Sequence, residues 1–195
     1  MLQPFSACFV VMPSPTAKSV VGISIGEEFF NLLFMSKVYS IKFVQNLPVP
    51  LEQAWDFFSR PDNLKDITPA NLGFKIISPD RGDRMYAGQV IEYKEHPVLG
   101  IPLYWMTEIT HVKDLEYFVD EQRFGPYSLW HHQHHFKAIE GGVEMTDIVH
   151  YKMPFWFLGN IANRLFVKKQ LDSIFSFRFN KAEEVFGKWI AGANS

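Results

Sequence analysis

Residues 130–136 read WHHQHHF and hold four of the seven histidines in the chain. Histidine side chains bind metal ions and exchange protons near neutral pH, so their arrangement decides which chemistry is open to them. If this segment is a β-strand, its side chains alternate between two faces. The face marked as buried by its aromatic ends carries Trp130, His132, His134 and Phe136. The opposite face carries His131, Gln133 and His135, and we expect its histidines to be solvated and without a role.

The hairpins on both sides of this strand add two carboxylates to the buried face. A two-residue loop at Gly141-Gly142 would pair residue 140 with residue 143. The expected cross-strand pairs are then Phe136 with Asp147, His134 with Val149, and His132 with Tyr151. The turn through residues 124–128 would give the pairs Gln122 with Trp130, Asp120 with His132, and Phe118 with His134. The strand before that offers Trp105, Thr107 and Ile109 to the same face.

This predicted face is aromatic and aliphatic except for one polar group. The polar group consists of Asp120, Gln122, His132, His134 and Asp147. A buried unpaired charge costs several kcal/mol, so a solid core rarely keeps two carboxylates. Either the carboxylates pair with the histidines, or the face borders a wet or ligand-filled space.

The elements that would position this face follow from the periodicity of the chain. Residues 39–47 alternate and predict a strand, and two short helices bounded by prolines follow over residues 49–60 and 62–69. Six further strands are predicted over residues 73–78, 88–96, 103–112, 116–124, 129–140 and 143–153. Between residues 158 and 190 apolar residues recur at helical spacing, which predicts one long amphipathic helix. This order predicts an α+β domain whose curved antiparallel sheet wraps around the final helix.

Composition narrows the classes of function. The formal net charge is −2 and no basic field is evident, so nucleic acid is not an expected partner. Cys8 is the only cysteine, which excludes an internal disulfide and indicates a reducing compartment, most simply the cytoplasm. No stretch reaches the ~18 apolar residues of a membrane helix, so stable membrane insertion is not expected. The sequence also lacks a nucleophile elbow and a phosphate-binding glycine loop.

Residues 1–36 do not fit the pattern of the domain. Their apolar stretch follows no Lys or Arg and is interrupted by Pro13 and Pro15, which makes a poor secretory signal. We interpret residues 1–36 as an N-terminal appendage and residues 37–190 as the domain. A specific docking or anchoring segment is the alternative for the appendage.

Three stretches carry a resemblance to a known superfamily: LPVPLEQAWDFFSRPDNLKDITP (47–69), FVDEQRFGPYSLWHHQHHF (118–136) and TDIVHYKMPF (146–155). Over residues 37–190 the chain resembles START/Bet v 1-like (SRPBCC) proteins, and among them bacterial ligand-binding SRPBCC and polyketide cyclase/dehydrase-like proteins. The resemblance implies the helix-grip fold, with about seven strands around a long C-terminal helix and a cavity between them. It implies a lipid, isoprenoid/quinone or polyketide-like ligand. It does not imply a reaction, because members carry lipids, bind hormones, cyclise polyketides or hydrolyse esters.

Three interpretations of the polar group remain open. His132 and His134 could bind one metal ion with Asp120 as a third ligand. Asp120 could instead orient His132 as a general base. In the third interpretation, which we favour, these residues only bind the polar end of a hydrophobic ligand, with no metal or cofactor. A protein-interaction or regulatory domain is a further alternative.

The leading prediction is therefore non-covalent binding or transport of a hydrophobic small molecule between the sheet and the C-terminal helix. The alternative is a cyclase/dehydratase-like enzyme that uses Asp120 and His132 as acid–base groups. The expected ligand-binding residues are Trp105, Thr107, Phe118, Asp120, Gln122, Trp130, His132, His134, Phe136, Asp147 and Tyr151.

Overall fold

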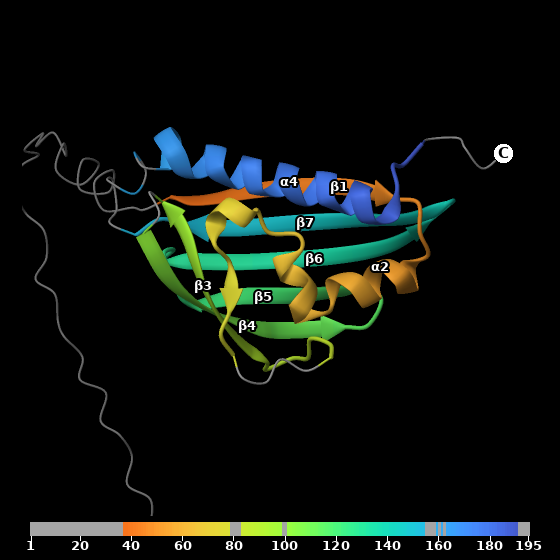
Figure 1. Cartoon of the computed structure of the whole chain (residues 1–195), viewed down its shortest axis with the longest axis horizontal. Coiled ribbons are helices and arrows are strands. Elements are labelled where there is room, and N and C mark those ends of the chain that lie inside the picture. Colours follow the sequence, from red (N-terminus) through yellow and green to blue (C-terminus); the bar gives the residue numbers. More distant parts are fainter. Residues whose placement is uncertain are drawn as a thin grey trace, which may run out of the picture.

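Seven antiparallel strands form one sheet in the order β1-β7-β6-β5-β4-β3-β2 (Figure 1). The computed structural model describes residues 37–78, 83–98, 101–154, 159, 161 and 163–190. The predicted appendage, residues 1–36, lies outside the described residues, as does Cys8. The strands are β1 Val38–Leu47, β2 Lys75–Ile76, β3 Val90–Val98, β4 Ile101–Lys113, β5 Tyr117–Phe124, β6 Leu129–Ile139 and β7 Gly142–Lys152. The seven predicted strands are confirmed.

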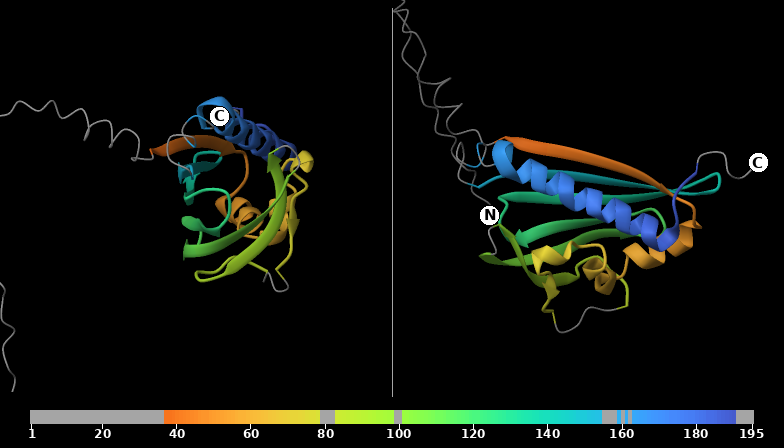
Figure 2. Two further views of the ribbon diagram at one scale, coloured as in Figure 1. Left: turned by 90° about the vertical axis from the view of Figure 1, so that its left-hand side faces the viewer. Right: turned by 45° about the horizontal axis from the view of Figure 1, so that its top comes forward.

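The sheet is strongly curved, and α4 closes the open side of the arc (Figure 2, left). Part of the curvature comes from irregular pairing between neighbouring strands. The register of β4 and β5 shifts between Met106 and Thr107 and again between Ile109 and His111. An extra residue at such a bulge bends its strand and increases the local twist.

Three short helical segments follow β1 and cover one end of the sheet. They are the α-helix α2 Leu51–Phe58 and the 3₁₀ helices η1 Pro61–Lys65 and η2 Ala70–Leu72. Pro50 occupies the N-cap of α2 and Pro61 begins η1, where a proline removes no helical hydrogen bond. Ala54, Trp55 and Phe58 form the buried face of α2. The sequence predicted two short helices here; the second, over residues 62–69, is the 3₁₀ helix η1, and η2 was not predicted.

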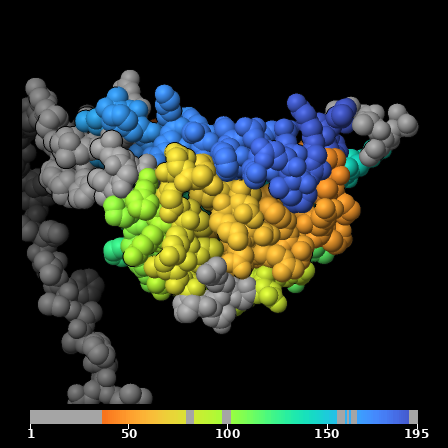
Figure 3. All heavy atoms as spheres, in the orientation of Figure 1, coloured from red at the N-terminus to blue at the C-terminus, as the bar shows by residue number. Residues whose placement is uncertain are grey.

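The C-terminal helix ends earlier than the sequence predicts. The α-helix α4 spans Lys168–Phe186, and the π-helical turn η3 Asn163–Val167 precedes it. At ~1.5 Å per residue, α4 is about 28 Å long. Gly187 ends it with φ 92°, a backbone conformation that favours glycine, so the predicted extension of the helix to residue 190 is wrong. Figure 3 shows that α4 (blue) lies against residues 51–76 (orange to yellow) on the face of the molecule that covers the sheet.

The two hairpins around β6 test the predicted registers. Asp120 faces His132 and Phe118 faces His134, as predicted. The pairing of Gln122 with Trp130 is not formed, because the β5–β6 ladder ends at Glu121 and His131. The predicted β6–β7 register is wrong by two residues, since Ile139 pairs with Gly142 and the loop is Glu140-Gly141.

A shift of two residues leaves every side chain of the hairpin on its predicted face. The observed β6–β7 pairs are Trp130 with Tyr151, His132 with Val149, His134 with Asp147, and Phe136 with Met145. The correction therefore brings Asp147 beside His134 instead of Phe136. It places the second carboxylate of the predicted polar group within reach of both histidines.

Besides a small cluster of Ile76, Ile91 and Ile109, two larger apolar clusters form the core of the domain. One gathers around Trp55 of α2, which packs edge-to-face on Phe118 and Phe136 with ring centroids 6.0 and 5.3 Å apart. The other joins Trp105, Trp130 and Tyr151 of the sheet to Leu171 and Phe175 of α4. None of the helices in the described part of the chain combines the length and the apolar character needed to cross a membrane.

Candidate functional site

The inward row of β6 links the two apolar clusters through a pair of histidines. Phe136 belongs to the cluster around Trp55, and Trp130 belongs to the cluster under α4. His132 and His134 lie between them and are buried, with 3% and 8% of their surface exposed. Strand alternation thus places two imidazoles between two patches of aromatic core.

These histidines form a closed cluster with two carboxylates from the neighbouring strands. Asp120 of β5 lies on one side, with Oδ2 2.9 Å from His134 Nε2 and 3.3 Å from His132 Nδ1. Asp147 of β7 lies on the other, with Oδ1 3.0 Å from His132 Nε2 and 2.8 Å from His134 Nδ1. The two rings lie 3.7 Å apart between centroids. We call these four residues the His–Asp cluster.

Two of the four contacts in the His–Asp cluster are well-aligned hydrogen bonds. His132 Nε2 donates to Asp147, and His134 Nε2 donates to Asp120, because an ionised carboxylate only accepts. His134 Nδ1 is buried and has no aligned partner among the described residues, despite its short distance to Asp147. In His132, Nδ1 faces Asp120 and Nε2 faces Asp147, so neither nitrogen points into open space.

The carboxylates and the histidines of the cluster each stabilise the charged form of the other. Burial acts to raise the pKa of Asp120 and of Asp147, but the adjacent histidines hold both pKa values well below the ordinary range. Burial acts to lower the pKa of His132, but the negative charge of Asp120 and the contacts with both carboxylates raise it to about 8. These shifts favour ionised carboxylates and a protonated His132 in the cluster.

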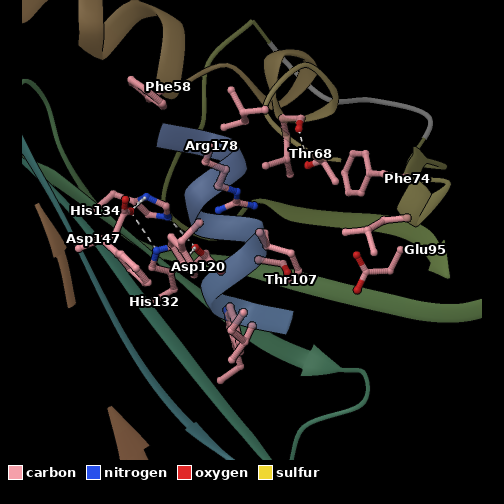
Figure 4. Close-up of a pocket in the computed structure, with 18 of the residues that line it drawn as sticks. Phe58, Thr68, Phe74, Glu95, Thr107, Asp120, His132, His134, Asp147 and Arg178 are labelled. Atoms are coloured by element: carbon pink, nitrogen blue, oxygen red, sulfur yellow. Dashed lines mark hydrogen bonds and ion pairs between the residues drawn. The ribbon is translucent and has the colours of Figure 1, made fainter. Parts of the chain in front are cut away.

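The His–Asp cluster borders a pocket of about 400 Å³ between the sheet, α4 and the helical segments after β1. This volume lies in the range of small-molecule sites. Figure 4 shows the cluster on one wall and Glu95 on another, with Arg178 projecting from α4 between them. The predicted ligand-binding residues that line the pocket are Trp105, Thr107, Phe118, Asp120, Trp130, His132, His134 and Asp147.

The structure places the other three predicted residues elsewhere. Gln122 bonds to both the backbone carbonyl and the backbone N–H of Tyr127, so its side chain holds the β5–β6 turn. Phe136 packs against Trp55 in the core. Tyr151 is 1% exposed and packs behind Trp130. Alternation gives the face of a residue, but it does not tell whether a neighbouring element covers that residue.

The outward histidines of β6 are half-buried on the convex side of the sheet, so the prediction that they are solvated is only partly correct. His131 Nδ1 lies 2.9 Å from Glu121, and His135 Nε2 lies 2.9 Å from the side chain of Gln133. They point away from the pocket and form local pairs.

Three charged residues of the pocket were not identified from the sequence. Arg60 is paired with Asp56, whereas Arg178 and Glu95 interrupt apolar patterns. Arg178 follows the buried residues Leu171 and Phe175 on the inward stripe of α4, four residues before Ala182. Glu95 continues the inward row of β3 after Ile91 and Tyr93. Each of these two is a charged residue at an apolar position of a periodic pattern, and that exception was a usable signal.

Arg178 and Glu95 are close enough to influence each other but form no ion pair. Burial raises the pKa of Glu95 to about 7, and the positive charge of Arg178 opposes that shift. The guanidinium carbon of Arg178 lies 5.4 Å from the ring centroid of Phe175. Its Nε is buried without a hydrogen-bond partner among the described residues.

Part of the His–Asp cluster also has the spacing of a cation site. Asp120, His132 and His134 each bring one ligand atom within 4.8 Å of the others. A metal there would have to replace the hydrogen bond between His134 and Asp120. The ion pairs within the cluster already account for the close approach of these side chains.

Comparison with known proteins agrees with this architecture. Residues 47–177 match the model of the family described as "Polyketide cyclase / dehydrase and lipid transport". The chain belongs to this family. The matched segment begins at the end of β1 and runs into α4, so it contains all four members of the His–Asp cluster and ends one residue before Arg178. No match was found among curated protein sequences.

Solved structures share the fold of this family member at low sequence identity. Protein TTHA0849 from Thermus thermophilus is 14% identical, with a TM-score of 0.60 over 75% of this chain and 95% of its own. Ginseng major latex-like protein 151 from Panax ginseng is 12% identical, with a TM-score of 0.57 over 76% of this chain and 97% of its own. These likenesses establish the Bet v 1-like helix-grip fold predicted from the sequence.

Proposed function

We propose that the protein binds a hydrophobic small molecule non-covalently in the pocket between the sheet and α4. The observation that supports this most directly is a pocket of about 400 Å³ whose wall is mainly apolar and which contains a small convergent polar group. Such a combination is typical of small-molecule sites. A lipid, isoprenoid/quinone or polyketide-like compound would suit the aromatic wall formed by Trp105 and Trp130. We expect the protein to act as a carrier or sensor in the cytoplasm, without nucleic acid as a partner.

Native mass spectrometry of the gently purified full chain tests this proposal. The expected spectrum contains a species heavier than the polypeptide, which loses the extra mass on denaturation and yields a defined organic compound on extraction. The matched control is Ile174→Trp, which enlarges a pocket-lining side chain of α4. This variant should lose the bound compound and keep the circular dichroism spectrum of the wild type. Failure of the wild type to bind any apolar compound would refute the proposal.

The second candidate function is acid–base catalysis, which the carboxylate-paired His132 favours. A general base must reach a substrate proton within hydrogen-bond distance. In this structure both nitrogens of His132 already face Asp120 and Asp147. Catalysis would require His132 to exchange one of these contacts for the substrate, so binding is the better-supported function. Turnover of a cyclisable or dehydratable substrate that disappears in His132→Gln would establish the second candidate instead.

A further inference from the structure

We propose that the ligand of this pocket is an amphipathic acid, and that Arg178 binds its single negative charge. The inference rests on the proposed function and adds the chemical class of the ligand. It starts from an unusual feature of α4, a guanidinium at a position where the helix otherwise presents buried apolar residues to the sheet.

Arg178 lacks a counterion within the described part of the chain. Other described arginines form ion pairs: Arg60, which also lines the pocket, and Arg84 are both paired with Asp56, and Arg123 is paired with Glu108 and Glu121. Arg178 instead contacts the ring of Phe175, and its Nε is buried with no hydrogen-bond acceptor. A partly buried cation with no ion-pair partner costs free energy, and an anion in the pocket would reduce that cost.

The neighbouring carboxylates do not take this role. Asp120 and Asp147 are bonded to the two histidines. Glu95 makes no ion pair with Arg178, and burial raises the pKa of its carboxyl to about 7. The acceptor that best satisfies a guanidinium is a carboxylate or phosphate bound by two parallel N–H groups.

The charge of the surrounding wall favours a single negative charge on the ligand. Arg178 supplies one positive charge, and the two carboxylates of the nearby cluster outnumber its one histidine with a raised pKa, His132. A dianion such as an alkyl phosphate would bring a second negative charge close to these carboxylates, and the other arginine that lines the pocket, Arg60, is already paired with Asp56. A carboxylate head on an apolar chain therefore fits better, with the chain against Trp105 and Trp130.

The test compares dodecanoic acid with 1-dodecanol, which have equal chain lengths and differ in charge. Binding to the delipidated full-length protein at pH 7.5 is followed by tryptophan fluorescence, because Trp105 and Trp130 line the pocket. We expect the acid to bind at least about tenfold more tightly than the alcohol, as charge-assisted bonds to guanidinium are strong. Dodecyl phosphate, mainly dianionic at this pH, should bind less tightly than the acid.

Arg178→Gln should remove the preference for the acid and leave the affinity for the alcohol within about twofold of wild type. Arg178→Lys retains the charge but not the paired N–H groups, so it should keep an intermediate preference and decides the question if Arg178→Gln does not fold. The matched control is Lys169→Gln, an exposed cation on the same helix, which should keep the full preference.

The possible failures separate the two proposals. If acid and alcohol bind equally well to the wild type, or if Arg178→Gln keeps the preference, the inference about Arg178 is wrong while the pocket remains a ligand site. A tighter complex with dodecyl phosphate would overturn the assignment of a single charge. If neither probe binds, both this inference and the proposed function fail.

Discussion

The buried ionisable residues make the stability of the fold depend on pH in a predictable direction. The pKa of His132 is raised to about 8 in the folded protein, against an ordinary value near 6.5. The stabilisation of the folded state that arises from His132 is therefore complete below pH ~6.5, and it is lost as the pH rises through 8. The pKa values of Asp120 and Asp147 are lowered, so their contribution is present above pH ~4 and is lost in acid.

Glu95 adds a pH effect that a single substitution can isolate. Burial raises the pKa of its carboxyl to about 7, so ionisation disfavours the folded state increasingly as the pH rises from 4.5 to 7. Glu95→Gln should raise the free energy of unfolding by about 1–3 kcal/mol at pH 8 and change it little at pH 4.5. Urea denaturation at the two pH values measures both quantities.

The matched control for this substitution is Glu116→Gln, which removes an exposed carboxylate from a surface ion pair with Lys113. Its effect should stay within about 1 kcal/mol at both pH values. An equal gain for Glu95→Gln at pH 4.5 and pH 8 would contradict the assignment of the effect to ionisation.

Individual residues show how far the sequence could predict the site. The alternation of β6 correctly identified His132 and His134 as inward-facing, and charged residues on the neighbouring strands supplied Asp120 and Asp147. Arg178 was missed because only apolar residues were used to define the face of the long helix. A cation in a helical apolar stripe carries more functional information than the apolar residues around it.

At the scale of elements, the β6–β7 hairpin explains why the predicted register was wrong. The two adjacent glycines have different roles. Gly141 has φ 81° in the loop, a conformation that favours glycine, whereas Gly142 begins β7. A Cβ atom on Gly142 would lie 2.1 Å from the backbone oxygen of Leu47 and 2.9 Å from the ring of Trp189. The requirement for glycine at position 142 comes from residues that are distant in sequence, so local turn preferences could not reveal it.

Gly142→Ala should destabilise the protein, because the backbone of β1 cannot move aside cheaply. We expect a loss of about 2–4 kcal/mol, comparable with overpacking of a core. Chemical denaturation measures the loss, and Ala138→Ser at an exposed position of β6 is the control. Unchanged stability of Gly142→Ala would show that β1 and β7 can separate at this point without cost.

The long helix is a second element whose limits the sequence predicted only in part. Its apolar spacing correctly indicated a helix across the sheet. The stop at Gly187 depends on a positive φ, and the turn before Lys168 is π-helical. Neither feature changes the apolar periodicity enough to be visible in the sequence.

At the scale of the whole molecule, we propose that residues 37–190 form an autonomous ligand-binding domain. All three core clusters, the His–Asp cluster and Arg178 lie within these residues. A chain that begins at Lys37 should therefore have the same melting temperature as the full chain, within about 2 °C, and the same affinity for dodecanoic acid.

Differential scanning fluorimetry and the fluorescence titration measure these two properties. A loss of affinity in the shortened chain would show that residues 1–36 contribute to the pocket or its entrance. A chain that begins at Trp55 is the negative control, because it lacks β1 and should not fold.

The position of α4 also bears on self-association. β1 is an outer strand of the sheet, and its edge away from β7 lies beside α4 (Figure 1). Gln45 donates to the carbonyl of Phe179, and Phe43 stacks on Phe175 with ring centroids 4.4 Å apart. An exposed strand edge can pair with strands from other chains. β1 offers a longer edge for such pairing than the opposite outer strand, β2, which has only two residues. Any motion that lifts α4 to admit a ligand would remove these contacts from the outer strand β1, so an occupied pocket should also protect the protein against aggregation.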